Sequence, residues 1–152
     1  MKTTANLEQI LKKADPEELS QYYDEQQDSL FSDEKPFTKY MREMISEKGL
    51  KQQTVFLKAD IPERYGYKLI SGEKHTIQRD LILRLCLAAN FSLKEADRAL
   101  KLYGFSPLYA KVRRDAVFMI CFNKKIYDME KVNLLLEEHG LEKLYECTLQ
   151  ED

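Results

Sequence analysis

The sequence of 152 residues has few turn residues, few cysteines and no long apolar run, which β-rich, disulfide-bonded and membrane-spanning proteins respectively require. It contains no Trp, five Gly and four Pro, and this scarcity of turn residues favours helices over strands joined by tight turns. Its three Cys, an odd number at wide spacing, indicate free thiols rather than a disulfide framework. The longest uninterrupted apolar run extends from Ala116 to Phe122, far below the ~20 residues that a membrane-spanning helix needs. We therefore expect a protein without a membrane segment.

Signals for export and for catalysis are missing as well. The first residues contain no apolar segment of the kind found in secretory signals, so we expect a cytoplasmic protein. No glycine-rich phosphate loop and no nucleophile motif of the G-x-S-x-G type occurs. The two histidines, His75 and His139, have no Cys or second His at the spacing of metal ligands. The sequence thus predicts no catalytic residue, no metal site and no cofactor, and it argues against an enzyme.

Charge is abundant but unevenly distributed. Apolar residues make up 43% of the chain and charged residues 33%, which suits a folded and highly soluble protein. The net charge of −2 would by itself disfavour a nucleic-acid partner. Residues 1–35, however, hold nine acids and four Lys, whereas residues 36–104 hold thirteen basic and eight acidic residues. The positive excess in the middle of the chain can meet a phosphate backbone locally, or it can be ordinary surface variation.

Apolar residues recur at spacings of three and four along the chain, which predicts an all-α fold. Asp15 and Pro16 are typical of the beginning of a helix, and the polar stretch 24–35 has the composition of a linker or a frayed helix end. Pro36 opens the next predicted helix, which ends at Gly49. We therefore separate an acidic helical arm with its linker, residues 1–35, from the helical segments that follow.

The second half of the chain contains an internal repeat. The segment from Arg79 to Cys86 matches the segment from Arg114 to Cys121 at a shift of 35 positions, and the match continues after one inserted residue. Each copy predicts two helices, the second of which ends at a Gly. The C-terminal extension, residues 105–152, is therefore predicted to form a helical hairpin that repeats the preceding one. Cys86 and Cys121 occupy equivalent apolar positions, where we expect small buried side chains.

The segment from Leu50 to Gly72 shows a distinctive order of residues: a Leu, a Gln that opens a helix, a four-residue connection, and a second helix that ends in Gly. This order resembles the helix-turn-helix of the lambda-repressor-like family, also called the XRE family. The matching positions are Leu50, Gln52, Val55, Leu57, Ile61, Leu69 and Gly72. The resemblance implies a five-helix DNA-binding domain within residues 36–104, and an apolar contact between the two helices is expected from Val55, Phe56, Ile61 and Leu69.

Candidate DNA contacts follow from the position of the second helix. If Pro62 opens that helix, its early outward residues are Glu63, Arg64, Tyr67 and Lys68. They offer Arg or Lys for guanine, a carboxylate for the cytosine amino group, and an aromatic face for the thymine methyl group. Of Tyr65 and Tyr67, we expect one to pack and the other to be exposed. Gln52 resembles the Gln with which the family contacts the DNA backbone, and Lys51, Lys74 and His75 are further candidates for phosphate contacts.

Three positions depart from the family pattern. Phe56 stands where the family usually has a small Ala, and Gly66 stands where it usually has a branched apolar residue. We expect the Phe56 ring to fill the space left by the missing side chain at Gly66. Asp60 replaces the usual Gly of the turn, and Asp tolerates the left-handed conformation better than most residues.

Two functions fit this sequence. The favoured one is a sequence-specific DNA-binding transcriptional regulator, and the resemblance implies a homodimer on a near-palindromic operator in double-stranded DNA. The alternative is a protein-interaction module, an antitoxin or adaptor, in which Arg64, Tyr67 and Lys68 form an ordinary solvated helix face. The C-terminal hairpin can supply the dimer surface, bind a protein partner, or belong to a monomeric core.

A second basic cluster lies outside this segment. Lys111, Arg113 and Arg114 can contact phosphate, but an ion pair between Arg114 and a neighbouring acid is the favoured interpretation. The reason is that the repeat carries the same Arg-Asp pair, Arg79 and Asp80, at the equivalent place.

Overall fold

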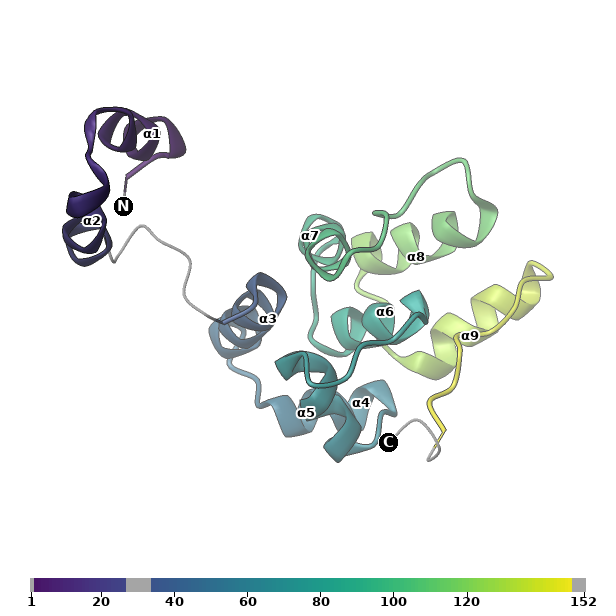
Figure 1. Cartoon of the computed structure of the whole chain (residues 1–152). Helices are drawn as coiled ribbons and strands as arrows, with labels where there is room; N and C mark the ends of the chain where they lie inside the picture. The colour runs from purple at the N-terminus through teal and green to yellow at the C-terminus, as the bar shows by residue number, and fades with distance from the viewer. Residues whose placement is uncertain (1, 27–33, 149–152) are drawn as a thin grey trace. The chain divides into compact units, whose positions relative to one another are not determined.

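The structure is a computed structural model that describes residues 2–26 and 34–148 (Figure 1). In these residues it forms nine α-helices and one short 3-10 helix, and it contains no β-strand there. The predicted all-α fold is thereby confirmed. Backbone contacts divide the chain into two compact units, residues 1–34 and Lys35–Asp152. Among the described residues, no helix is long and apolar enough to cross a bilayer.

Unit 1 consists of two short helices joined by a 3-10 helix. Thr3 caps α1 (Thr4–Lys13), because its Oγ1 accepts a hydrogen bond of 3.2 Å from a backbone N–H of the first turn. Pro16–Glu18 form the 3-10 helix, and α2 (Leu19–Glu25) follows directly. The predicted helix start at the proline is therefore a 3-10 helix that leads into the α-helix. Most of the predicted linker, residues 24–35, lies outside the described residues.

The first five helices of unit 2 form its main core, and the buried α6 lies between α4 and α7. They are α3 (Pro36–Glu47), α4 (Gln52–Ala59), α5 (Glu63–Ser71), α6 (Arg79–Ala88) and α7 (Leu93–Tyr103). α4 and α7 both pack on α6, and every residue from Leu81 to Ala89 is buried. α3 packs on α7 and on α5, and α5 also packs on α4. The α4–α5 segment is thus supported from two sides.

The last two helices, α8 (Arg113–Lys124) and α9 (Met129–Glu138), form the second hairpin that the repeat predicted. The turns of the two hairpins match, since Asn90 and Lys125 both have the left-handed conformation, with φ of 60° and 57°. Both cysteines of the repeat are buried, as expected. Burial raises the pKa of both thiols, and that of Cys121 reaches about 11.

Two reciprocal ion pairs join the hairpins where α6 and α8 begin. Arg79 of the first hairpin contacts Asp115 of the second at 2.8 Å, and Arg114 of the second contacts Asp80 of the first at 2.7 Å. Each Asp also accepts a backbone N–H, at 3.0 and 2.8 Å, from the segment that follows the other hairpin. This exchange of equivalent contacts relates the hairpins by an approximate twofold axis. Arg114 thus forms an ion pair, as favoured from the sequence, but its partner is Asp80 of the other hairpin and not a neighbouring acid.

The segment after α9 is attached to the core by a buried arginine. Arg84 of α6 is 2% exposed, and its guanidinium donates hydrogen bonds to the backbone carbonyls of Ala59, Leu144 and Tyr145 at 3.1, 3.3 and 2.7 Å. Burial lowers the pKa of Arg84, while nearby carboxylates such as that of Asp60 oppose the shift. The end of α4 and the C-terminal segment are thereby held by one side chain.

Candidate functional site

The turn between α4 and α5 sets the crossing of the two helices. Asp60 has the left-handed conformation, with φ of 56°, which the sequence predicted for the residue that replaces Gly. The Ile61 N–H donates to the Phe56 carbonyl at 3.1 Å and closes the end of α4. Pro62 occupies the N-cap position, and α5 begins at Glu63. The start at Pro62 considered from the sequence is thus one residue early.

The interior of this segment has the predicted exchange of side-chain volume. Val55, Phe56, Ile61 and Leu69, expected to join the two helices, are all buried. A Cβ added to Gly66 would lie 2.6 Å from Cγ of Phe56, which is closer than any Cβ contact tolerates. Phe56 is itself fully buried. The ring therefore occupies the space that a side chain at Gly66 would need, and this expectation is confirmed.

The outer face of α5 carries the predicted base-reading residues. Glu63 and Arg64 are exposed, Tyr67 is 45% exposed, and Lys68 is half-buried. Tyr65 is buried, so one tyrosine of this helix packs and the other is exposed, as predicted. Because the inner face of α5 is buried in the core, the orientation of its polar outer face is fixed.

The exposed Tyr67 is held in place rather than loosely solvated. Its ring meets the Phe56 ring edge-on, with 4.9 Å between the centroids and 80° between the planes. The same Phe56 that replaces a side chain at Gly66 therefore also orients an aromatic group on the outer face. The family pattern, with a small residue at this position, gave no signal for such a contact.

A groove between α3, the start of α4 and α5 brings three of the predicted residues together. Gln52, Tyr67 and Lys68 line it, and Arg42 of α3 lines it as well. Gln52 is the first residue of α4, and the preceding Lys51, at the N-cap, is exposed and offers no side-chain acceptor to the first turn. Arg42 was missed from the sequence because it lies on an earlier helix, which only the packing of α3 on α5 places here.

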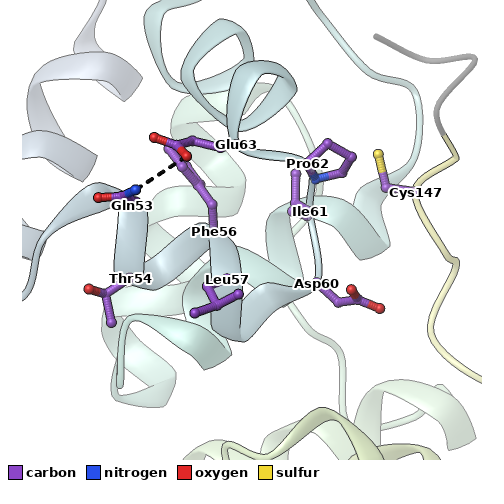
Figure 2. A pocket seen from close by; sticks show the side chains of 9 residues that line it. All are labelled: Gln53, Thr54, Phe56, Leu57, Asp60, Ile61, Pro62, Glu63 and Cys147. Carbon is purple, nitrogen blue, oxygen red and sulfur yellow. Dashed lines mark hydrogen bonds between the residues drawn. The ribbon is translucent and has the colours of Figure 1, made fainter.

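Glu63 lies apart from that groove, in a cleft formed by α4, the turn and the segment after α9 (Figure 2). Gln53 Nε2 donates a hydrogen bond of 3.4 Å to Glu63 Oε2, and Figure 2 shows the two side chains turned toward one another. Leu57 and Cys147 also line the cleft. The Glu63 carboxylate thus accepts a hydrogen bond from Gln53, a residue that the sequence did not indicate although it is next to Gln52.

The loop after α5 holds the last two candidates. Lys74 and His75 are both exposed. The His75 ring stacks on Tyr103 of α7, with 4.5 Å between centroids and 9° between the planes. The N–H of Thr76 donates to the Tyr103 hydroxyl at 2.7 Å. These contacts attach the loop to α7, and they give His75 a packing role that its sequence position did not indicate.

The start of α3 fastens the end of α5. Thr38 Oγ1 donates to the Ile70 carbonyl at 2.6 Å, and Lys35 Nζ donates to the Gly72 carbonyl at 3.1 Å. Gly72 ends the helix with a φ of 84°, the left-handed conformation that glycine adopts readily. Both ends of α5 are therefore fixed, one by the turn and one by α3.

Comparisons with known proteins add no further candidate site. No family model matches the sequence, and neither the curated proteins nor the solved structures gave a significant match. Within the described part of the chain, no group of three or more His, Cys, Asp or Glu side chains is placed to hold a metal ion. The function is therefore inferred from the residues and geometry of the α4–α5 segment.

Proposed function

We propose that the protein is a sequence-specific DNA-binding transcriptional regulator in which α5 enters the major groove of double-stranded DNA. Helices α3 to α7 then constitute a lambda-repressor-like domain within residues 36–104. The two-sided character of α5 carries this proposal: Tyr65 and Leu69 are buried, whereas Arg64 and Tyr67 are exposed. A short helix that is fixed by its inner face and polar on its outer face is suited to groove reading.

The side chains on this face match the chemistry of base edges. Arg64 and Lys68 lie one helical turn apart and carry the donors that recognise guanine O6 and N7. Tyr67 lies between them along the helix, and its ring can contact a thymine methyl group. Glu63 and Gln53 are joined by a hydrogen bond and form one unit that offers an acceptor to the cytosine amino group and an amide to adenine.

Residues next to this helix make the proposed contacts with the DNA backbone. Gln52 and Lys51 stand at the start of α4, where the backbone N–H groups and the helix dipole attract a phosphate. Lys74 and His75 lie in the loop after α5, which Tyr103 holds in place. Such contacts set the orientation of the protein on DNA and leave base selection to α5.

The proposal includes a homodimer that binds a near-palindromic operator, with the two α5 helices in successive major grooves about 34 Å apart. It also places the protein in the cytoplasm, as a regulator without catalytic activity and without a cofactor. The positive excess of residues 36–104 supports it, since this section contains the whole α4–α5 segment.

The alternative is a protein-interaction module, and two exposed apolar side chains favour it. Leu57 of α4 is 81% exposed, and Ile77, in the loop before α6, is 87% exposed. A protein partner that covers either side chain would remove apolar area from water. In such a module Arg64 and Lys68 are ordinary solvated cations.

Selection of binding sites from a pool of random DNA duplexes tests the proposal. The wild-type chain should enrich one sequence, and Arg64→Ala combined with Lys68→Ala should abolish the enrichment. Lys94→Ala combined with Arg98→Ala is a matched control, because it removes the same two charges at the same spacing from the exposed face of α7. Enrichment that survives the first double substitution would remove α5 from the reading role, and a pool without enrichment would support the interaction module.

A further inference from the structure

A cleft formed by α3, α7 and the end of α8 opens on a different side of unit 2 from the outer face of α5. Its volume is about 940 Å³, which is in the range of about 300–1,000 Å³ that is typical of sites for small organic ligands. On α3, Thr38 and Arg42 line the groove beside α5, whereas Tyr40, on the opposite side of that helix, lines the cleft. Figure 1 shows α7 above α6, with α4 and α5 below it. The cleft is therefore separate from the residues proposed to contact DNA.

Three cations of α7 line this cleft. Lys94, Arg98 and Lys101 are spaced by four and three positions, so they lie along one face of the helix, and all three are exposed. Within the described residues, none of them makes a hydrogen bond or an ion pair. Like charges at this spacing oppose helix formation, and a bound anion would remove that repulsion.

The repeat shows that a hairpin of this kind does not need these cations. At a shift of 36 positions, their counterparts on α9 are Glu130, Leu134 and Glu137. α9 nevertheless forms the second helix of its hairpin, as α7 does. The three cations of α7 are therefore not a requirement of the hairpin fold, and binding of an anion gives them a role.

The two carboxylates that line the cleft have partners of their own. Glu95 forms an ion pair of 2.9 Å with Lys48, which neutralises it. Asp97 accepts a hydrogen bond of 2.9 Å from the Leu108 N–H. In the second hairpin a neutral residue, Asn133, accepts the equivalent N–H, so this contact does not depend on charge. The cleft thus keeps three cations against one carboxylate.

Other lining residues are aromatic, apolar or neutral. Tyr40 and Leu93 are half-buried, and Asn123 is exposed. The Tyr40 hydroxyl donates to the Glu95 carbonyl at 3.0 Å, and its ring meets the Phe91 ring edge-on. Burial raises the pKa of Tyr40 to about 12, so its hydroxyl stays neutral. A fixed aromatic ring and an amide suit a planar heterocycle, which can stack on the ring and bond to the amide.

We propose that this cleft binds a nucleoside phosphate, with its phosphates on Lys94, Arg98 and Lys101 and its base on the Tyr40 ring. Phosphate oxygens accept charge-assisted hydrogen bonds from Lys and Arg, and a base has a flat face that stacks on an aromatic ring. Neither an inorganic phosphate nor a free nucleoside uses both parts of the cleft. The inference goes beyond the proposed function and does not depend on DNA binding, because the cleft and the outer face of α5 share no lining residue.

Isothermal titration calorimetry of the full-length chain, without DNA, tests the site. The probes are ATP, GTP, CTP and UTP, and pyrophosphate and the corresponding nucleosides represent the two parts of the ligand alone. At least one triphosphate should bind with a dissociation constant below about 1 mM, and pyrophosphate and its nucleoside at least about 10-fold more weakly. The proposal would be overturned if none of the four triphosphates binds, or if pyrophosphate binds as tightly as they do.

The repeat also supplies the variant for this test. Lys94→Glu, Arg98→Leu and Lys101→Glu together give α7 the residues that α9 has at the equivalent positions, so the helix should remain folded. This variant should bind the triphosphate at least about 100-fold more weakly. The control changes the net charge by the same amount at three exposed cations outside the cleft, and it should bind like the wild type. Its substitutions are Lys58→Glu, Lys111→Leu and Lys131→Glu.

Circular dichroism checks that both variants are folded, and Arg98→Ala alone replaces the triple variant if helicity is lost. The single substitution should weaken binding at least about 5-fold. Unchanged affinity in the folded variant would overturn the assignment of the phosphates to α7. The bound triphosphate should also remain bound when an equal concentration of a random-sequence DNA duplex is added. Displacement by the duplex would overturn the proposal and assign these cations to the DNA backbone.

Discussion

Phe56 and Gly66 interlock between α4 and α5, and each explains the presence of the other. The ring is fully buried and leaves no room for a Cβ at Gly66. Phe56→Ala should lower the free energy of unfolding by about 3–5 kcal/mol, since it removes a buried ring and leaves a cavity beside a glycine. Denaturant titration measures the loss, and a value below about 1 kcal/mol would contradict the exchange of volume.

The effect of an alanine at Gly66 should change sign with the residue at position 56. In the wild type the added Cβ meets the Phe56 ring, so Gly66→Ala should destabilise the fold. In the Phe56→Ala background the same change should stabilise it by about 0.5–1 kcal/mol, because Ala favours a helix over Gly. A double-mutant cycle in denaturant gives the coupling, and equal effects in both backgrounds would show that the residues do not interact.

Arg84 is a buried cation that only the first hairpin has, since its counterpart in the repeat is Met119. Arg84→Met keeps an extended side chain but leaves three backbone carbonyls without their donor. We expect a loss of about 2–4 kcal/mol in the free energy of unfolding. Arg98→Met, on the exposed face of α7, is the control and should stay within about 0.5 kcal/mol of the wild type. If both substitutions lower the free energy of unfolding equally, Arg84 does not anchor the C-terminal segment.

Among the elements, the reciprocal ion pairs at the start of α6 and α8 connect stability to pH. Burial of Asp80 would raise its pKa, but the hydrogen bonds from Arg114 and from the Tyr145 N–H outweigh burial, so the pKa of Asp80 is lowered. A carboxyl whose pKa is lower in the folded chain stabilises the fold above its unfolded pKa of about 3.9, and this contribution is lost as the pH falls further.

Asp80→Asn should therefore lower the free energy of unfolding at pH 7 and flatten its decline between about pH 5 and pH 3. Denaturant titrations at a series of pH values measure this decline. Glu47→Gln removes an exposed acid of α3 and should leave both the stability and its decline close to those of the wild type. A decline in Asp80→Asn as steep as that of the wild type would show that the ion pair does not contribute.

The elements were predictable where the deciding residues are neighbours in sequence. Ser92 and Glu95, three positions apart, form a capping box at the start of α7, with hydrogen bonds of 3.2 and 2.8 Å. The repeat likewise predicted the second hairpin. The exchange of partners between Arg79 and Arg114 was beyond the sequence, because each Arg precedes an Asp and only the twofold relation directs it to the distant one.

The candidate site divides in the same way. From the sequence, Glu63, Arg64, Tyr67 and Lys68 were expected on the outer face of α5. The first three are exposed, Lys68 is half-buried, and one tyrosine packs while the other is exposed. Arg42 and the Gln53–Glu63 hydrogen bond depend on how helices cross, and no short-range pattern encodes that. The sequence therefore identified the outer face of α5 but not the neighbours that shape it.

At the scale of the whole molecule, charge is separated along the chain. Residues 36–104 carry the positive excess, whereas residues 1–35 hold nine acids against four Lys. If DNA binding neutralises phosphates, the affinity must fall steeply with salt, with a slope of about −0.9 per phosphate in a plot of log K against log salt concentration. If the protein binds DNA as proposed, the tethered acidic arm competes with the phosphate backbone for the basic section, and salt also screens this competition.

Removal of residues 1–32 should accordingly tighten DNA binding at low salt, and the difference should shrink as the salt approaches about 0.5 M, where screening is short-ranged. Fluorescence anisotropy with a labelled operator measures both affinities across the salt series. A full-length variant with Glu8→Gln, Glu17→Gln and Glu18→Gln separates charge from bulk, since it keeps the arm and removes three exposed acids. It should reproduce part of the gain. If the deletion leaves the affinity unchanged, the arm has no electrostatic influence on binding. If the deletion increases the affinity but the triple substitution does not, the volume of the arm and not its charge weakens binding.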